Sequence, residues 1–190
     1  AVETMTELIE YYKGIFTILS SCASRQLEEV TFRRTVIPVQ ELFDAAGKYF
    51  KKMMKNRTER IELEMEPMEA RVIGDVNQLR FLLENLIDEA LTFREDGVLR
   101  LQVRKDDGYI RFLFTDTRRE KSVEELNQLF YPNLARMTSG EKGELRGTEY
   151  LVCKQIIRDH DEFAGRRGCR INAEPAADGG FTVYFTVPRK

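Results

Sequence analysis

Apolar residues recur at spacings of three and four in four long segments of the chain, and this period predicts amphipathic helices. The segments are residues 5–30, 39–55, 76–93 and 148–158. Asp75 directly precedes the third segment and is a suitable N-cap, because a carboxylate there accepts a backbone N–H of the first turn. A shorter helical pattern covers residues 123–130, within an otherwise polar stretch.

Strand patterns lie between and after these helices. Alternating or apolar runs predict strands at residues 61–65, 98–104, 109–115, 169–174 and 181–187, and an extended stretch at 31–37. The turn at residues 105–108, Lys-Asp-Asp-Gly, is typical of a hairpin. We therefore expect an α+β fold, a two-layer sandwich with one mixed sheet of about five strands covered on one face by three helices.

The first helix stands apart from the other elements and predicts a helical arm over residues 1–30, followed by one domain over 31–190. Its apolar stripe runs from Leu8 to Cys22. An isolated arm with such a stripe needs a partner helix, either from a second copy of the chain in a homodimer or from a preceding segment.

Composition narrows the class of protein. Apolar residues make up 42% of the 190 residues, enough for a core, and the net charge is only −2. Lysines and arginines are scattered among acids, which excludes a nucleic-acid-binding protein. Three dispersed cysteines are typical of a reducing compartment. We find no apolar run of membrane-spanning length. We expect a cytoplasmic fragment of a longer protein, and that longer protein can carry a membrane anchor in another segment.

Six segments carry a resemblance, in order along the chain: IELEMEP, GDVNQLRFLLENLIDEALTF, FLFTDTRRE, LFYPN, LRGTEYLVCKQIIRDH and GGFTVYFTVP. Together they resemble the catalytic ATP-binding domain of histidine kinases, in the Bergerat-fold family shared with gyrase and Hsp90. The resemblance covers residues 31–188. Residues 1–30 resemble the second helix of the dimerisation domain that precedes such domains. His160, the sole histidine, follows the last long helix, so we expect no phosphoacceptor in this chain.

The resemblance implies that one flank of the third helix faces the triphosphate and magnesium. Asn85 matches the first family asparagine, whereas Glu89 replaces the second and Thr92 replaces a lysine that approaches phosphate. Asn85 and Glu89 are therefore the candidate magnesium ligands. The alternative is that Asn85, Glu89 and Thr92 are the solvated edge of an amphipathic helix.

Both glycine-rich segments of the family are altered. Asp116 matches the aspartate that accepts a hydrogen bond from the adenine amino group, but Arg118 and Glu120 replace the two glycines that follow, and we expect them to fill the pocket. At the second segment Gly147 and Thr148 remain. Glu149 replaces a glycine and competes with phosphate for the helix N-terminus. Alternatively, Asp116 is an ordinary strand-end residue and Gly147 an ordinary helix start.

The favoured interpretation is a signalling module of a two-component-type sensor, with an eroded nucleotide site and no bound cofactor, which acts through contacts with a signalling protein or the rest of its own chain. One alternative is a divergent, active kinase domain that binds ATP and magnesium. Another is a binding module for a different small anion, with four candidate arginines: Arg118, Arg119, Arg166 and Arg167. We expect His160 to cap or pack near the end of the last helix.

Overall fold

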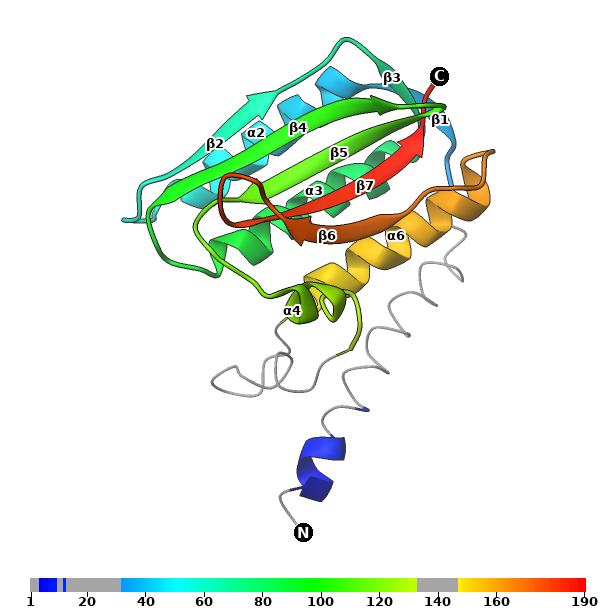
Figure 1. The fold of residues 1–190 in the computed structure, drawn as a ribbon. Helices are drawn as coiled ribbons and strands as arrows, with labels where there is room; N and C mark the ends of the chain where they lie inside the picture. The colour runs from blue at the N-terminus through cyan, green and yellow to red at the C-terminus, as the bar shows by residue number, and fades with distance from the viewer. Residues whose placement is uncertain (1–3, 10–11, 13–31, 133–146) are drawn as a thin grey trace.

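Five strands form one mixed sheet in the computed structural model, which describes residues 4–9, 12, 32–132 and 147–190 (Figure 1). The strand order is β2-β4-β5-β7-β6; β2 pairs with β4 in parallel, and the other neighbours are antiparallel. The bounds are β2 Ile61–Glu66, β4 Gly97–Asp106, β5 Tyr109–Asp116, β6 Ile171–Pro175 and β7 Phe181–Pro188. The five predicted strands therefore share one sheet, as expected.

Three helices cover one face of this sheet: α2 (Val39–Met54), α3 (Val76–Leu91) and α6 (Glu149–Phe163) (Figure 1). The core lies between the two layers, because alternate residues of each central strand point towards the helices. Phe112 of β5 lies between Phe43 of α2, at a ring distance of 6.3 Å, and Phe185 of β7, at 4.9 Å. The two-layer α+β prediction is confirmed.

A small second sheet differs from the prediction. β1 (Thr35–Pro38) pairs antiparallel with β3 (Arg71–Gly74) beside the N-terminal end of α3. The stretch expected to be extended thus contains β1, whereas β3 was not predicted, because four residues are too few for a visible alternation. A short helix, α4 (Val123–Asn127), is closed at its N-terminus by the capping box of Ser122 and Glu125.

The N-cap prediction at Asp75 is confirmed, since its Oδ1 accepts the backbone N–H of Gln78 at 3.1 Å. α6 extends to Phe163, beyond the predicted end at 158, and His160 lies inside it rather than capping it. His160 is buried; its Nε2 accepts the backbone N–H of Asp75 at 3.1 Å, and its Nδ1 lies 2.8 Å from the carbonyl of Ile156. The imidazole therefore ties α6 to the start of α3.

The burial of His160 makes the stability of the fold depend on pH. Desolvation lowers the pKa of His160 to about 4, despite the opposing effects of the Ile156 carbonyl and the Asp75 charge. An unfolded histidine has a pKa near about 6.5, so the unfolded chain binds the extra proton as the pH falls below that value. The stabilising effect of the neutral imidazole is thus present above pH 6.5 and is lost towards pH 4.

We expect the free energy of unfolding to fall by about 2 kcal/mol between pH 7 and pH 5 through His160 alone. Urea unfolding at a series of pH values measures it. His160→Gln is the control: it should be less stable at pH 7 and should show a flatter pH profile between 7 and 5. Equal slopes for both proteins would contradict the assignment.

The structure describes only the start of the predicted helical arm. Residues 4–9 and 12 are helical, and Leu8 and Tyr12 are 50% and 62% exposed. The remainder of the predicted helix over residues 5–30, including Cys22, lies outside the described residues, so the boundary between arm and domain stays a prediction. Within the described residues, no helix has the length and apolar character needed to span a membrane.

Candidate functional site

Two of the sequence-predicted site residues, Asp116 and Glu89, meet where β5 ends near α3 and the first turn of α6. Figure 1 shows how these three elements are arranged. Asp116 is the last residue of β5 and is only 2% exposed. Glu89 lies on α3 and reaches the same region, because both are bound by one arginine. The structure therefore brings Asp116 and Glu89 together, as the resemblance implied.

Arg118 turns inwards and forms a two-pronged ion pair with Asp116. Its Nε donates to Oδ1 and its Nη2 to Oδ2, both at 3.0 Å. The remaining guanidinium protons are donated to the carbonyls of Ala90, Phe93 and Glu95, at 2.6, 2.9 and 2.9 Å. All five N–H donors of this side chain are thus used, and it is 2% exposed.

These carbonyls belong to the last turn of α3 and the loop after it, where helix carbonyls lack partners within the helix. A guanidinium at this position satisfies them and interacts favourably with the negative end of the helix dipole. Arg118 therefore closes the end of α3 and neutralises Asp116 at the same time.

Arg119 joins Asp116 to Glu89. Its Nε donates to Oδ2 of Asp116 at 2.9 Å, and its Nη1 and Nη2 donate to the two carboxylate oxygens of Glu89 at 3.0 and 2.8 Å. The Tyr150 hydroxyl also donates to Glu89. The result is a continuous network, Tyr150–Glu89–Arg119–Asp116–Arg118, which we call the arginine network.

The arginine network holds two positive and two negative side chains in a mostly dry environment. Burial raises the pKa of Asp116, but hydrogen bonds from Arg118 and the charges of Arg119 and Arg118 outweigh it, so the pKa lies below its usual value. The pKa of Tyr150 is raised by burial and by Glu89. The carboxylate of Asp116 therefore stays ionised and Tyr150 stays a proton donor.

Asn85 and Thr92 are turned to their own helix. The Asn85 side chain is 8% exposed and donates to the Phe81 carbonyl at 2.8 Å, while the Thr92 hydroxyl donates to the Glu89 carbonyl at 2.6 Å. Of the two candidate magnesium ligands, Glu89 has both carboxylate oxygens bound to Arg119, whereas the bond that Asn85 makes uses its amide nitrogen and not its oxygen. Across the described part of the chain, no group of three or more His, Cys, Asp or Glu residues is placed to hold a metal ion.

Gly147 and Thr148 precede α6. Gly147 has a positive φ of 80°, and Thr148 is the N-cap residue but makes no side-chain capping bond. Glu149 follows in the first turn, and its Oε2 is buried without a hydrogen-bond partner among the residues that the structure describes. Burial raises the pKa of Glu149, and the charges of Glu89 and Asp88 raise it further. Negative charge therefore gathers at this helix start.

Glu120 differs from the expectation that it fills the pocket. Its Oε1 accepts the backbone N–H of Gly180, at 2.9 Å, in the turn between β6 and β7. Gly180 has a φ of 80°, and a Cβ there would lie 2.0 Å from the Asp116 carbonyl oxygen. The segment after β5 is thus fastened against this turn, and of the two substituted residues only Arg118 points inwards.

The prediction that Arg118, Arg119, Arg166 and Arg167 form one anion site is wrong. Arg118 and Arg119 follow the end of β5, whereas Arg166 bonds to Gly108, which precedes its start. The eight residues of β5 span roughly 25 Å. Arg167 pairs with Asp161 on the Arg166 side. Within the arginine network, Tyr150 is the residue that the sequence analysis did not identify.

Comparison with known proteins places this geometry in a family. A family model described as histidine kinase-, DNA gyrase B- and HSP90-like ATPase matches residues 74–190, more than half of the chain. The chain therefore belongs to this family. No curated protein sequence gives a significant match.

Solved structures agree on the fold, which is that of histidine kinase catalytic domains. The nucleotide-free catalytic domain of histidine kinase ThkA has a TM-score of 0.62 at 18% identity, covering 83% of this chain and 98% of that one. A mycobacterial sensor histidine kinase, MprB, gives 0.58 at 16% identity over 84% and 99%. Acinetobacter baumannii histidine kinase AdeS gives 0.57 at 15% identity over 98% and 79%.

Proposed function

We propose that this chain is a signalling module of a two-component-type sensor, whose ATPase-like domain acts through protein contacts rather than through bound nucleotide. One observation carries the proposal: the two carboxylates that would receive the adenine and the magnesium, Asp116 and Glu89, are already bound to Arg118 and Arg119. The domain keeps the family fold, and the arginine network takes the position of a ligand within it.

The strongest support comes from Asp116, the residue that would bind adenine. An adenine amino group needs a free oxygen on Asp116, but both oxygens accept hydrogen bonds from arginines. Displacing Arg118 would break five side-chain hydrogen bonds and expose the end of α3. A single amino-group hydrogen bond contributes about 1 kcal/mol net and does not offset that loss.

The phosphate side adds two unfavourable features. Magnesium is held by oxygen ligands, and both carboxylate oxygens of Glu89 are bound to Arg119. Glu89 and Asp88 lie near enough to Glu149 for their charges to raise its pKa, and these acids repel a polyphosphate approaching the start of α6. We infer that ATP and magnesium do not serve as cofactors of this domain.

The competing function is an active, divergent kinase domain, in which Asn85, Glu89, Asp116, Gly147 and Thr148 hold ATP and magnesium. The placement of Asp116 at the end of β5 and of Gly147 before α6 favours it. A structure of full-length ShkA in complex with AMPPNP has the same fold, with a TM-score of 0.59 at 16% identity. The two functions differ in one measurable property, nucleotide affinity.

The partner we propose is a signalling protein, a second copy, or the remainder of the sensor chain in the cytoplasm. ThkA is known in complex with the response regulator TrrA, and that structure matches all of this chain at a TM-score of 0.63 and 18% identity. The exposed apolar side chains Leu8 and Ile9 on the arm support a helix-to-helix contact.

We expect the chain to be a homodimer whose dissociation constant changes less than about twofold when ATP and magnesium are added, because dimer contacts and the arginine network do not depend on nucleotide. Light scattering over a concentration series measures it. Leu8→Glu should weaken the dimer at least about tenfold, since it buries a charge. Val123→Glu, at a comparably exposed site on α4, is the matched control. A strict monomer would overturn the homodimer, and a dimer that requires nucleotide would overturn the proposal that the domain acts without bound nucleotide.

A further inference from the structure

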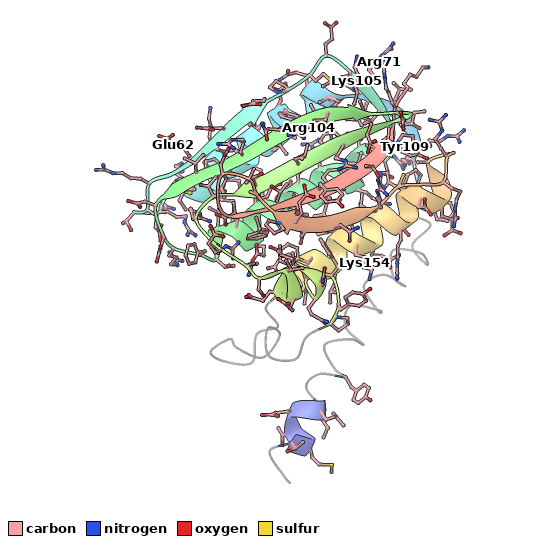
Figure 2. All side chains as sticks on the ribbon, in the orientation of Figure 1. Glu62, Arg71, Arg104, Lys105, Tyr109 and Lys154 are labelled. Atoms are coloured by element: carbon pink, nitrogen blue, oxygen red, sulfur yellow. The ribbon has the colours of Figure 1, made fainter. Side chains whose placement is uncertain are left out.

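A hollow of about 530 Å³ is lined by residues of β1, the C-terminal end of β7 and the loop after α6. Figure 1 shows these elements at the end of the sheet away from the end of β5. Four cationic residues line it: Arg34, Arg166, Arg189 and Lys190. No aspartate or glutamate is among its lining residues. Figure 2 shows Arg71 and Lys105 at this same end of the molecule.

This concentration of positive charge is local, because the whole chain has a net charge of −2. Three of the four side chains, those of Arg34, Arg189 and Lys190, form no ion pair with any residue that the structure describes. Asp161, near the C-terminal end of α6, is engaged elsewhere: it accepts the backbone N–H groups of Gly168 and Cys169 and pairs with Arg167. Like charges around a hollow repel one another, and a bound anion removes that cost.

Two glycines lie beside the cations of the hollow. Arg34 lies against Gly165, which has a φ of 92°, and a Cβ there would approach its Nη1 to 2.7 Å. Arg166 donates to the Gly108 carbonyl at 2.9 Å and lies 5.6 Å from the Tyr109 ring centre. The Arg189 backbone N–H donates to the same carbonyl, also at 2.9 Å. Gly108 thus anchors the Arg166 side chain and the Arg189 backbone at the hollow, while the Arg34 and Arg189 guanidinium groups keep their donors available for an anion.

We propose that this hollow is a binding site for a small, multiply charged anion that carries phosphate groups. Guanidinium groups match phosphate oxygens with paired hydrogen bonds, which favours phosphate over monovalent anions. The volume lies within the range of small-ligand sites, about 300–1,000 Å³. The site is separate from the arginine network, which lies beyond the opposite end of β5, and it does not depend on the proposed loss of nucleotide binding.

Calorimetry of the 190-residue chain with inorganic pyrophosphate, at low ionic strength, tests the proposal. We expect saturable binding that weakens at least about tenfold in Arg34→Gln/Arg189→Gln, since the variant removes two charge-assisted contacts to phosphate. Neither side chain makes a hydrogen bond in the described structure, so the variant should keep its melting temperature. Lys51→Gln/Lys52→Gln, on the exposed surface of α2, removes the same charge and should bind within about twofold of the parent.

A second experiment distinguishes a lipid headgroup from a free phosphate compound as the natural ligand. It measures binding of the chain to vesicles of phosphatidylcholine and an anionic phospholipid. Vesicle binding that pyrophosphate displaces would support the site with a lipid headgroup as its natural ligand. Vesicle binding that pyrophosphate leaves unchanged would overturn it. So would the absence of saturable pyrophosphate binding, or equal weakening in the two double variants.

Discussion

Replacing Arg118 with alanine is expected to lower the free energy of unfolding by about 3–5 kcal/mol, the range for removing one partner of a buried ion pair. The variant leaves part of the Asp116 carboxylate and the carbonyls of Ala90, Phe93 and Glu95 without their donor in a nearly dry region. Arg119 still contacts one Asp116 oxygen, so some compensation remains.

Urea unfolding at pH 7 measures this effect. Arg111→Ala is the matched control, because its pair with Asp106 is 26% and 33% exposed and should contribute less than about 1 kcal/mol. Combining Arg118→Ala with Asp116→Ala should recover part of the loss, with a coupling of about 1.5 kcal/mol or more. If Arg118→Ala costs no more than Arg111→Ala, Arg118 is not the buried anchor described here.

Most of the fold could be predicted from the sequence, because its long elements have clear periods. The five strands of the main sheet alternate or are uniformly apolar, and each helix shows its apolar stripe. β3 has four residues and no period to detect. The last turns of α6 carry Asp159, Asp161 and Glu162, and this polar run concealed a helix whose buried side there holds His160.

The site could be predicted in part. The order of motifs located Asp116, Glu89 and Gly147, but a sequence does not say which cation reaches which acid. Arg119 meets Glu89 across 30 residues of chain, and Tyr150 meets it across 61. These contacts depend on how β5 and α6 are placed relative to α3. Arg118 lies only two residues after Asp116, yet only the structure distinguishes an inward guanidinium from one that turns out to meet a phosphate.

The second large effect concerns nucleotide affinity. We expect ATP–magnesium to bind with a dissociation constant no better than about 1 mM. Three unfavourable contributions act together: the occupied oxygens of Asp116, the occupied oxygens of Glu89, and the negative charge of Glu149 at the start of α6. At about 1–2 kcal/mol each, they lower a micromolar affinity by roughly a thousandfold, since each 1.4 kcal/mol is about tenfold.

Calorimetry with ATP and magnesium tests this central claim most directly. It should be run on the parent chain, on Asp116→Ala, and on Arg34→Gln/Arg189→Gln, so that any binding at the basic hollow is recognised by its loss in the last variant alone. We expect no saturable binding with a dissociation constant below about 1 mM that depends on Asp116. Micromolar, saturable binding that Asp116→Ala abolishes would contradict it and would establish the active kinase domain instead.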